Sequence, residues 1–356
     1  MSTPYIQQWS LNLQWEFMPN WLFEIGYTGS KGTKLLQIAN SNMALDVDPL
    51  GFMPRVGPDV PGGGWTGNYY DLVGEDEDEF VNVDTPPSWC DLTDDPGDCT
   101  LSAEVRAPVI GFDEDEGVNT LYSNGTSIYN SLQASLQKRF SSGYMYNINY
   151  TFSRSIDTFS DESDFQIQND QRNWGSNRGL SDFHRKHRLV LSGTWDLPFR
   201  GNKVLEGWSL SGIGTLQSGT PFTVIDDDYS AFLFETSDPR PILVGTHDDQ
   251  ATNGPVNERV DNYLNRSAFQ SSGPYFGNLG RNTVMGPDQR RVDLVLSKLT
   301  TIREGISLEL RGEFFNAFNT VSFRNPESDM TESSFGEIEA TRGGPRVIQL
   351  GLKLKF

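Results

Sequence analysis

The sequence predicts an all-β fold of antiparallel strands, each with one apolar face and one polar face. One observation is the last segment, residues 347–356, in which apolar and polar side chains alternate to the final Phe356. A second is the same alternation in residues 9–17. A period of two places successive side chains on opposite faces of a strand. A third is the regular exchange of short and long connections along the chain. Together these features are typical of a transmembrane antiparallel β-barrel, whose outward face meets lipid.

Composition agrees with this fold class and argues against a nucleic-acid partner and against a transmembrane helix. The 356 residues are 36% hydrophobic and carry a net charge of −20, with a pI of about 4.5. We expect no nucleic-acid partner, because phosphate binding needs a basic surface. No run approaches the ~18 apolar residues of a transmembrane helix. Barrel strands escape that criterion, because they are about ten residues long and alternate.

The N-terminal region predicts a hairpin. Residues 9–17 form one strand, a turn follows at 18–20, and residues 21–28 form the next strand. Trp15, Phe17 and Trp21 gather beside the turn, as aromatic residues do at a membrane interface. The first five residues show no basic segment followed by an apolar one. We therefore expect an export signal upstream of a partial chain.

Seven further strands follow from the same alternation. They are expected at residues 132–137, 144–153, 188–195, 208–217, 292–297, 306–314 and 347–356. The resulting nine strands are an odd number, whereas single-chain bacterial barrels have an even number and a closed sheet. The sequence therefore predicts a partial barrel of about nine or ten strands, the tenth lying within a long connection.

The connections between these strands fall into two classes. Short turns lie on the side where the chain ends, and we expect them to be periplasmic. Long connections rich in Gly, Pro, Asp and Glu are expected to be extracellular loops, at about residues 36–127, 157–185, 224–290 and 319–345.

Several segments resemble a known family, the C-terminal barrel half of TonB-dependent outer-membrane receptors, in the subgroup with a carboxypeptidase-regulatory-like domain. The segments are residues 4–12, 24–33, 129–140, 150–157, 178–183, 217–222, 276–282, 311–319 and 346–356. The resemblance covers nearly all the strand regions and little of the acidic connections. Its specificity comes from the order of the segments.

The resemblance implies a barrel of about 22 strands in the bacterial outer membrane, with a plug domain inside it. It also implies energy supplied by TonB acting on the plug, and recognition of Phe356 by the barrel-assembly machinery. This chain contains neither plug nor TonB box. We therefore expect residues 1–356 to be one barrel segment, not competent alone, that contacts TonB only through the absent plug.

Two cysteines, Cys90 and Cys99, flank a short acidic segment. In the oxidising compartment that the barrel interpretation implies, they are candidates for a disulfide. Two free thiols are the alternative. Reduction of a disulfide would loosen only this loop.

Acidic runs at 75–79, 113–116 and 226–228 are candidates for calcium binding, because calcium prefers carboxylate oxygens. None has the spacing of an EF-hand, and solvated loops are the simpler expectation. His184 and His187 have the spacing of zinc ligands on a helix, but they precede a strand, where a water-exposed rim position is expected. We expect no metal and no cofactor.

Charged residues at alternate positions of one strand mark its polar side. Glu309, Arg311 and Glu313 are expected to face the lumen, opposite the lipid, where they can contact a plug or a ligand. The segment 29–33 lacks the spacing of a phosphate-binding loop, and no nucleophile elbow is present.

The leading hypothesis is therefore an uptake receptor, not an enzyme, whose barrel wall contacts lipid and whose loops capture an external small molecule or oligosaccharide. One alternative is an outer-membrane protease or lipase, for which Asp182, His184 and His187 are the candidate catalytic residues. The other is a soluble calcium-dependent β-sandwich lectin. Detergent-free solubility would favour the lectin.

Overall fold

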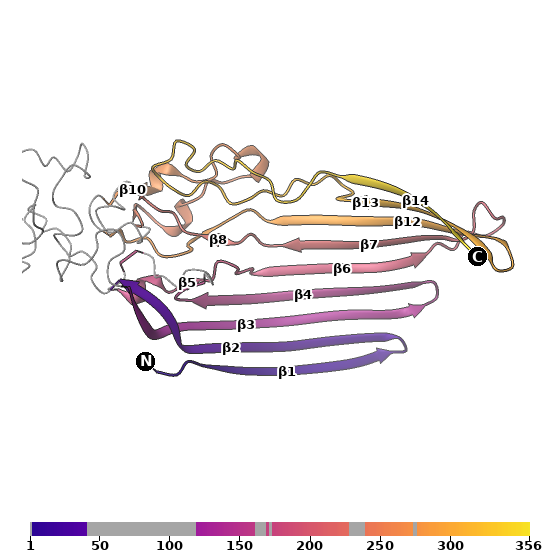
Figure 1. The fold of residues 1–356 in the computed structure, drawn as a ribbon, viewed down its shortest axis with the longest axis horizontal. Coiled ribbons are helices and arrows are strands. Elements are labelled where there is room, and N and C mark those ends of the chain that lie inside the picture. The colour runs from indigo at the N-terminus through magenta and orange to yellow at the C-terminus, as the bar shows by residue number, and fades with distance from the viewer. Residues whose placement is uncertain (1, 41–118, 161–168, 171–172, 228–238, 273–275) are drawn as a thin grey trace, which may run out of the picture.

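The main sheet is antiparallel, and its long strands follow each other in chain order, as a computed structural model shows (Figure 1). Two small two-stranded sheets lie outside it, β8 (Pro221–Phe222) with β11 (Val284–Met285) and β9 (Ile242–Leu243) with β10 (Phe269–Gln270). The structure describes residues 2–40, 119–160, 169–170, 173–227, 239–272 and 276–356. The strands of the main path are β1 (Tyr5–Met18), β2 (Trp21–Asn40), β3 (Asn119–Ser141), β4 (Tyr144–Asp157), β6 (His187–Asp196), β7 (Trp208–Gln217), β12 (Gln289–Arg303), β13 (Ile306–Phe315) and β14 (Val347–Lys355). The nine predicted strands are confirmed, each in its predicted place.

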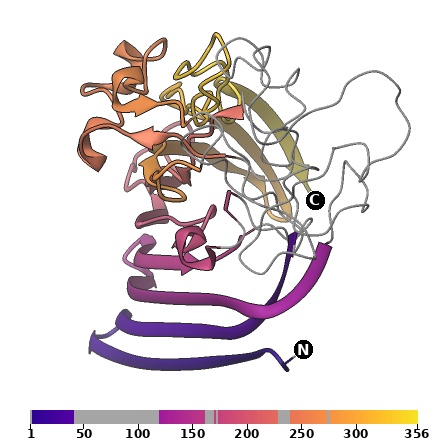
Figure 2. The same cartoon turned by 90° about the vertical axis from the view of Figure 1, so that its left-hand side faces the viewer.

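The sheet is curved and open. Seen along the strands it forms an arc, with β1 and β14 at its two edges (Figure 2). Short turns join the strands at the end where the C-terminus lies, and long connections leave from the other end (Figure 1). Curvature follows from the right-handed twist of adjacent strands. An arc of this kind, with each strand hydrogen-bonded to the next, is part of a barrel wall.

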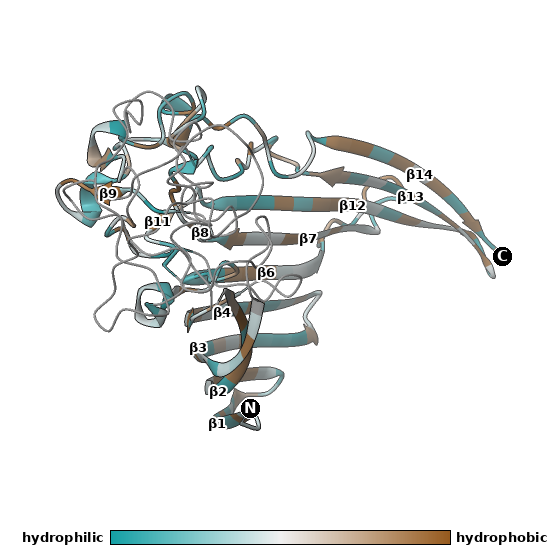
Figure 3. Ribbon diagram, turned by 60° about the vertical axis from the view of Figure 1, so that its left-hand side comes forward, coloured by the Kyte–Doolittle hydropathy of each residue, from teal (hydrophilic) through white to brown (hydrophobic). Residues whose placement is uncertain are grey.

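The register sorts side chains onto two faces. Trp9, Leu11, Leu13 and Trp15 are opposite Gly29, Tyr27, Ile25 and Phe23, so one side of the first hairpin is almost wholly apolar. On β14 the apolar residues Leu350, Leu352 and Leu354 are highly exposed. The hydropathy colouring of β14 is mostly that of apolar residues (Figure 3). We call this side the apolar face, and the side carrying Asn12, Glu24 and Glu313 the polar face. Exposure of such large side chains in an intact sheet indicates contact with lipid.

Aromatic residues gather on the apolar face near the short turns. The rings of Trp15 and Phe17 are 5.5 Å apart, and those of Phe17 and Trp21 are 5.8 Å apart. Trp21 also meets Tyr146 of β4 edge-on, at 5.4 Å. The predicted cluster beside the first turn is confirmed, and it extends across neighbouring strands.

The long connections contain more structure than the sequence predicted. Strand β2 continues to Asn40 and β3 begins at Asn119, so the expected loop at 36–127 is too long at both ends. The connection before β6 holds β5 (Gly179–Leu180) and the 3-10 helix η2 (Trp174–Asn177). The connection before β12 holds β8 (Pro221–Phe222), β9 (Ile242–Leu243), β10 (Phe269–Gln270), β11 (Val284–Met285) and the short 3-10 helices η5 (His247–Asp249), η6 (Val256–Glu258) and η7 (Arg266–Ala268).

Two of these connections fold together into a compact unit, which we call the loop cap (residues 218–227, 239–272, 276–288 and 316–346). Its buried core consists of Phe222, Val224, Tyr263, Leu264, Ala268, Phe269, Leu279, Val284, Met330 and Ile338. Backbone hydrogen bonds join the two connections, from Met330 N to Ile225 O at 2.9 Å and from Ile338 N to Val260 O at 2.7 Å. The cap therefore has a hydrophobic core of its own, separate from the lipid-facing side of the sheet.

No helix in the described part of the chain is long and apolar enough to cross a membrane.

Candidate functional site: the polar face and its rim

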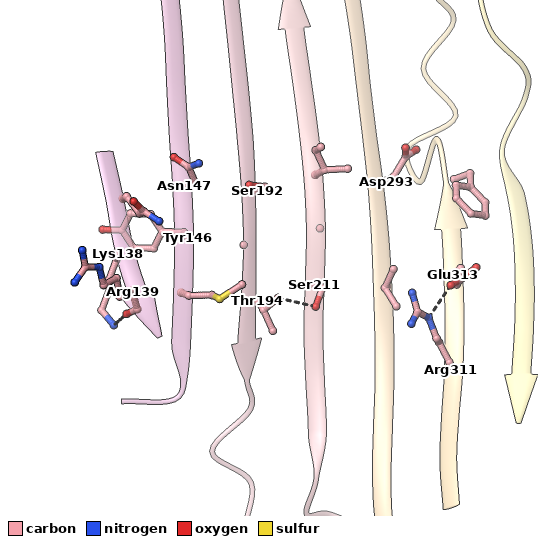
Figure 4. A pocket seen from close by; sticks show the side chains of 17 residues that line it. Lys138, Arg139, Tyr146, Asn147, Ser192, Thr194, Ser211, Asp293, Arg311 and Glu313 are labelled. Atoms are coloured by element: carbon pink, nitrogen blue, oxygen red, sulfur yellow. Dashed lines mark hydrogen bonds and ion pairs between the residues drawn. The ribbon is translucent and has the colours of Figure 1, made fainter. Parts of the chain in front are cut away.

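The polar face carries a groove of about 480 Å³ that crosses strands β3 to β13 (Figure 4). Its wall combines polar and charged side chains with the apolar Met145, Ile213, Val295 and Phe315. The polar and charged residues are Asn147, Ser192, Thr194, Ser211, Asp293, Arg311 and Glu313. These residues reach one surface because they occupy alternate positions on neighbouring strands. Thr194 and Ser211 hydrogen-bond across β6 and β7 at 3.0 Å. The carbonyl oxygen of the Asn147 side chain is buried without a partner.

Glu309, Arg311 and Glu313 share the polar face of β13. Arg311 Nε lies 2.6 Å from Glu313 Oε1, and Lys355 Nζ of β14 lies 2.7 Å from Glu309 Oε2 (Figure 4 shows the first pair). Pairing keeps these side chains in fixed orientations, although partly exposed pairs add little stability. At the other edge of the sheet, Glu24 accepts hydrogen bonds from Asn12 and Gln14. The polar face is thus an ordered, hydrogen-bonded surface.

A buried charged network closes the rim where the long connections leave the sheet. Arg281 donates from Nη1 to Asp157 Oδ1 at 2.7 Å, and from Nη2 to Asp182 Oδ1 at 2.9 Å and Ser160 Oγ at 2.6 Å. Asn282 donates to Leu180 O at 2.6 Å. One arginine therefore joins the end of β4, the following connection and the loop cap.

A second buried arginine extends this network. Arg240 is 1% exposed, its backbone N donates to Asn169 Oδ1 at 3.0 Å, and its Nη1 donates to Ser176 O at 3.1 Å. Burial, with the positive charge of Arg281 nearby, lowers the pKa of Arg240 to about 10. It remains protonated at neutral pH, so two cations are held inside the rim by carbonyls and carboxylates.

The sequence did not single out Arg281, Asp157 or Arg240 as site residues. Three of the family-like segments nevertheless meet at Arg281, namely 150–157, 178–183 and 276–282. The order of these segments along the chain was the available signal. Their meeting point shows that a shared rim network connects segments far apart in sequence.

The two histidines are separated by the structure. His184 is buried, contrary to the predicted water-exposed position, and its Nδ1 accepts a hydrogen bond from Ser155 N at 3.2 Å. His187 is exposed on β6, and its Nδ1 is 2.8 Å from Tyr150 Oη. Asp182 is engaged by Arg281 and Asn282. The three candidate catalytic residues of the enzyme alternative do not converge.

Some of the other predicted sites lie in the described residues and some lie outside them. Cys90, Cys99 and the acidic runs at 75–79 and 113–116 lie outside the described residues. Asp226 is buried, and its Oδ2 accepts a hydrogen bond from Ser272 N at 3.2 Å. Within the described ranges, no group of three or more His, Cys, Asp or Glu side chains is arranged to hold a metal ion. Phe356 is 96% exposed at the end of the apolar face.

An open antiparallel arc with an exposed apolar face, a polar inner wall and a folded rim defines an outer-membrane β-barrel protein. A family model described as "Outer membrane beta barrel domain" matches residues 1–349. The chain belongs to this family, which places it in the bacterial outer membrane. No curated protein sequence matches the chain.

Solved structures with a similar fold include two outer-membrane proteins. The outer-membrane transporter YddB of Escherichia coli is 11% identical, with a TM-score of 0.45, and the match covers 99% of this chain and 33% of that one. FpvA of P. aeruginosa, solved with heterologous pyoverdines, is 10% identical, with a TM-score of 0.42 and coverage of 98% and 27%. A complex of FpvAI with pyocin S2 gives a similar match. The chain thus spans a third or less of the length of these proteins.

Proposed function

We propose that this chain is the C-terminal wall of a TonB-dependent uptake receptor, and that the loop cap captures an external ligand. The observation that carries the proposal is the position of the loop cap. It is a folded unit, joined by hydrogen bonds and ion pairs, at the end of a barrel wall that has a polar inner surface. Loops that only joined strands would not need a hydrophobic core, two buried arginines and hydrogen bonds between connections. Because the loop cap is already ordered, its loops lose little conformational entropy when a ligand binds.

In this proposal the polar face is the lumen wall. The pairs Arg311–Glu313 and Lys355–Glu309 would face a plug domain supplied by the rest of the receptor. Because they are partly exposed, they can exchange partners when a plug moves. TonB would act on the plug and not on this wall.

The exposed Phe356 ends the apolar face, and we propose that the barrel-assembly machinery recognises it there. We propose an iron chelate or an oligosaccharide as the ligand, because solutes of either kind are too large for simple diffusion. Residues 1–356 would then be one segment of a larger closed barrel, since an open sheet edge is costly in hydrocarbon.

Growth experiments test this function. A strain lacking the gene and a strain lacking TonB are compared with the parent on a panel of iron chelates as sole iron source and oligosaccharides as sole carbon source. We expect both mutants to fail on the same compound at low concentration. The proposal would be overturned if the strain lacking the gene grew normally on every compound on which the strain lacking TonB fails.

A further inference from the structure

The polar face is divided into a charged part and an uncharged part. On β12, β13 and β14 the charged side chains pair with one another. The pairs are Arg291 with Asp293 at 3.0 Å, Arg311 with Glu313 at 2.6 Å, and Lys355 with Glu309 at 2.7 Å. Lys353 lies directly opposite Glu309 in the register. We call the polar face of these three strands the charged sector. Each of its carboxylates has a cationic partner, so the charges largely compensate one another.

The neighbouring strands β3, β4, β6 and β7 carry hydroxyl and amide groups on the same face, and we call the middle of this face the uncharged sector. By register it comprises Gln133, Ser135, Gln137, Asn147, Asn149, Thr151, Ser192, Thr194, Ser211 and Thr215, with the apolar Met145, Val190 and Ile213 among them. Among the described residues of these strands, charges on the polar face lie only toward the ends. Asp157 and Arg188 lie near the rim, and Arg139 and Asp196 lie near the short turns. Each end has one charge of each sign, so neither sign dominates.

Several polar groups of the uncharged sector have no partner within the protein. The side chains of Ser135, Asn149, Thr151, Ser192 and Thr215 are half-buried, and in the described part of the chain none of them forms a hydrogen bond. A hydroxyl or amide group both donates and accepts hydrogen bonds. These five side chains can therefore bond a solute hydroxyl in either direction, whereas the cations of the charged sector already have carboxylate partners.

Two hollows lie over the uncharged sector. Ser192, Thr194 and Ser211 line the groove of about 480 Å³ near the short turns (Figure 4). Asn149 and Thr151 line a second hollow of about 360 Å³, which extends to β1 and β2.

The spacing of these polar groups suits a solute that carries many hydroxyls. Side chains on one face of a sheet recur about every 6.6 Å along a strand and about every 4.8 Å from strand to strand. A solute with closely spaced hydroxyls can therefore form a new hydrogen bond before it loses the last one. The apolar Val190 and Ile213 lie among these groups and can contact the C–H faces of sugar rings.

We infer that the uncharged sector is the part of this wall along which the solute moves, and that the solute is an uncharged, hydroxyl-rich oligosaccharide. A charged iron chelate would bind unpaired charges of opposite sign, because charge-assisted hydrogen bonds are the strong ones. The uncharged sector offers free hydroxyls and amides instead. The inference rests on the proposed uptake function and selects one of its two ligand classes.

The test measures uptake by cells that lack the chromosomal gene and carry the complete receptor. Short oligosaccharides of glucose, xylose, mannose and arabinose are the uncharged probes, and ferric citrate is the anionic probe. The variant combines N149L and S192A, which remove hydrogen-bonding groups with little change in size. The matched control combines Q349M and S307A, on the polar face of β14 and β13. We expect receptor-dependent uptake of an uncharged probe, about fivefold or more slower with the first variant and unchanged with the control.

Receptor-dependent uptake of ferric citrate and of no oligosaccharide would overturn the inference and leave the uptake function standing. Equal oligosaccharide uptake by the parent and the N149L/S192A variant would also overturn it. Uptake of no probe would count against the inference and the uptake function together. The amount of receptor in the outer membrane is measured with an antibody. If the double variant does not reach the membrane, S192A alone carries the test, with uptake about twofold or more slower expected, and unchanged uptake would overturn the inference.

Discussion

Arg281 Nη1 lies 2.7 Å from Asp157 Oδ1, and both side chains are about 5% exposed. These residues are separated by 124 positions in the sequence. The pair joins the last residue of β4 to the loop cap, and Asp182 shares the same guanidinium. A buried pair of this kind is costly to break, because the remaining charge stays buried without a partner.

We predict that Arg281→Met detaches the cap from the sheet rim. Breaking a buried pair costs about 3–5 kcal/mol, so the local opening free energy should fall by a similar amount. Hydrogen exchange of residues 157–160 and 176–182 measures it directly. Arg291→Met breaks the more exposed pair with Asp293 at 3.0 Å and should change exchange by less than about 1 kcal/mol. Equal effects of the two variants would contradict this role for Arg281.

Acid should loosen the same rim through His184. Burial, and then the positive charges of Arg154 and Lys186, lower the pKa of His184 below its ordinary value of 6.5. The folded state therefore binds fewer protons than the unfolded state, and stability is lost as the pH falls from 6.5 toward the folded pKa. Protonation also removes the Nδ1 acceptor of Ser155 N.

The amide protection factor of Ser155, compared between pH 7.5 and 5, checks this prediction. We expect protection to fall at pH 5 in the parent protein. In His184→Gln, the side-chain oxygen can still accept the bond but does not titrate, so protection should be independent of pH. A parent protein with the same protection at both values would contradict the prediction.

Lys138 should stabilise the turn between β3 and β4. Lys138→Met keeps an apolar stem of similar length but removes the donors to Ser141 O and Tyr144 O. It also removes the cation that lies 3.7 Å from the Tyr144 ring centre. We expect a loss of about 1–3 kcal/mol in urea unfolding from lipid vesicles. Arg139→Met removes a charge from an exposed neighbour and serves as the control, with a change within about 0.5 kcal/mol.

Gly219 should fix where the loop cap leaves the sheet. A Cβ at Gly219 would collide with the carbonyl oxygen of Gly286, which is backbone and cannot move aside as a side chain can. Gly219→Ala should therefore separate the two chain segments and destabilise the cap by about 1–3 kcal/mol. Limited proteolysis between residues 239 and 272 should accelerate. Gly344→Ala, where no atom lies within 4 Å of the added carbon, should leave proteolysis unchanged.

The strands were predictable because their physics is local. Alternation in residues 9–17 and 347–356 identifies a strand and both of its faces without knowledge of any partner. The loop cap was not predictable in this way. Its core residues Leu264, Phe269, Met330 and Ile338 show no period and come from two separate connections, so only the tertiary structure brings them together.

The candidate site also has a part that the sequence predicts and a part that it does not. Glu309, Arg311 and Glu313 share one face because they are two residues apart on one strand, and alternation is enough to place them together. The rim network depends on contacts across more than a hundred residues, which no local pattern encodes. His184 was misplaced for the same reason, because its burial comes from neighbours outside its own segment.

The central claim is that the apolar face of these strands contacts lipid. The test introduces single cysteines at positions 349–354 of β14, in a background with Cys90 and Cys99 replaced by serine. Each cysteine carries a fluorescent label, and quenching by brominated lipids is measured in the membrane-inserted protein. We predict strong quenching at positions 350, 352 and 354 and weak quenching at 349, 351 and 353, a period of two. Quenching that is uniform along the strand, or strongest at the odd positions, would contradict the account.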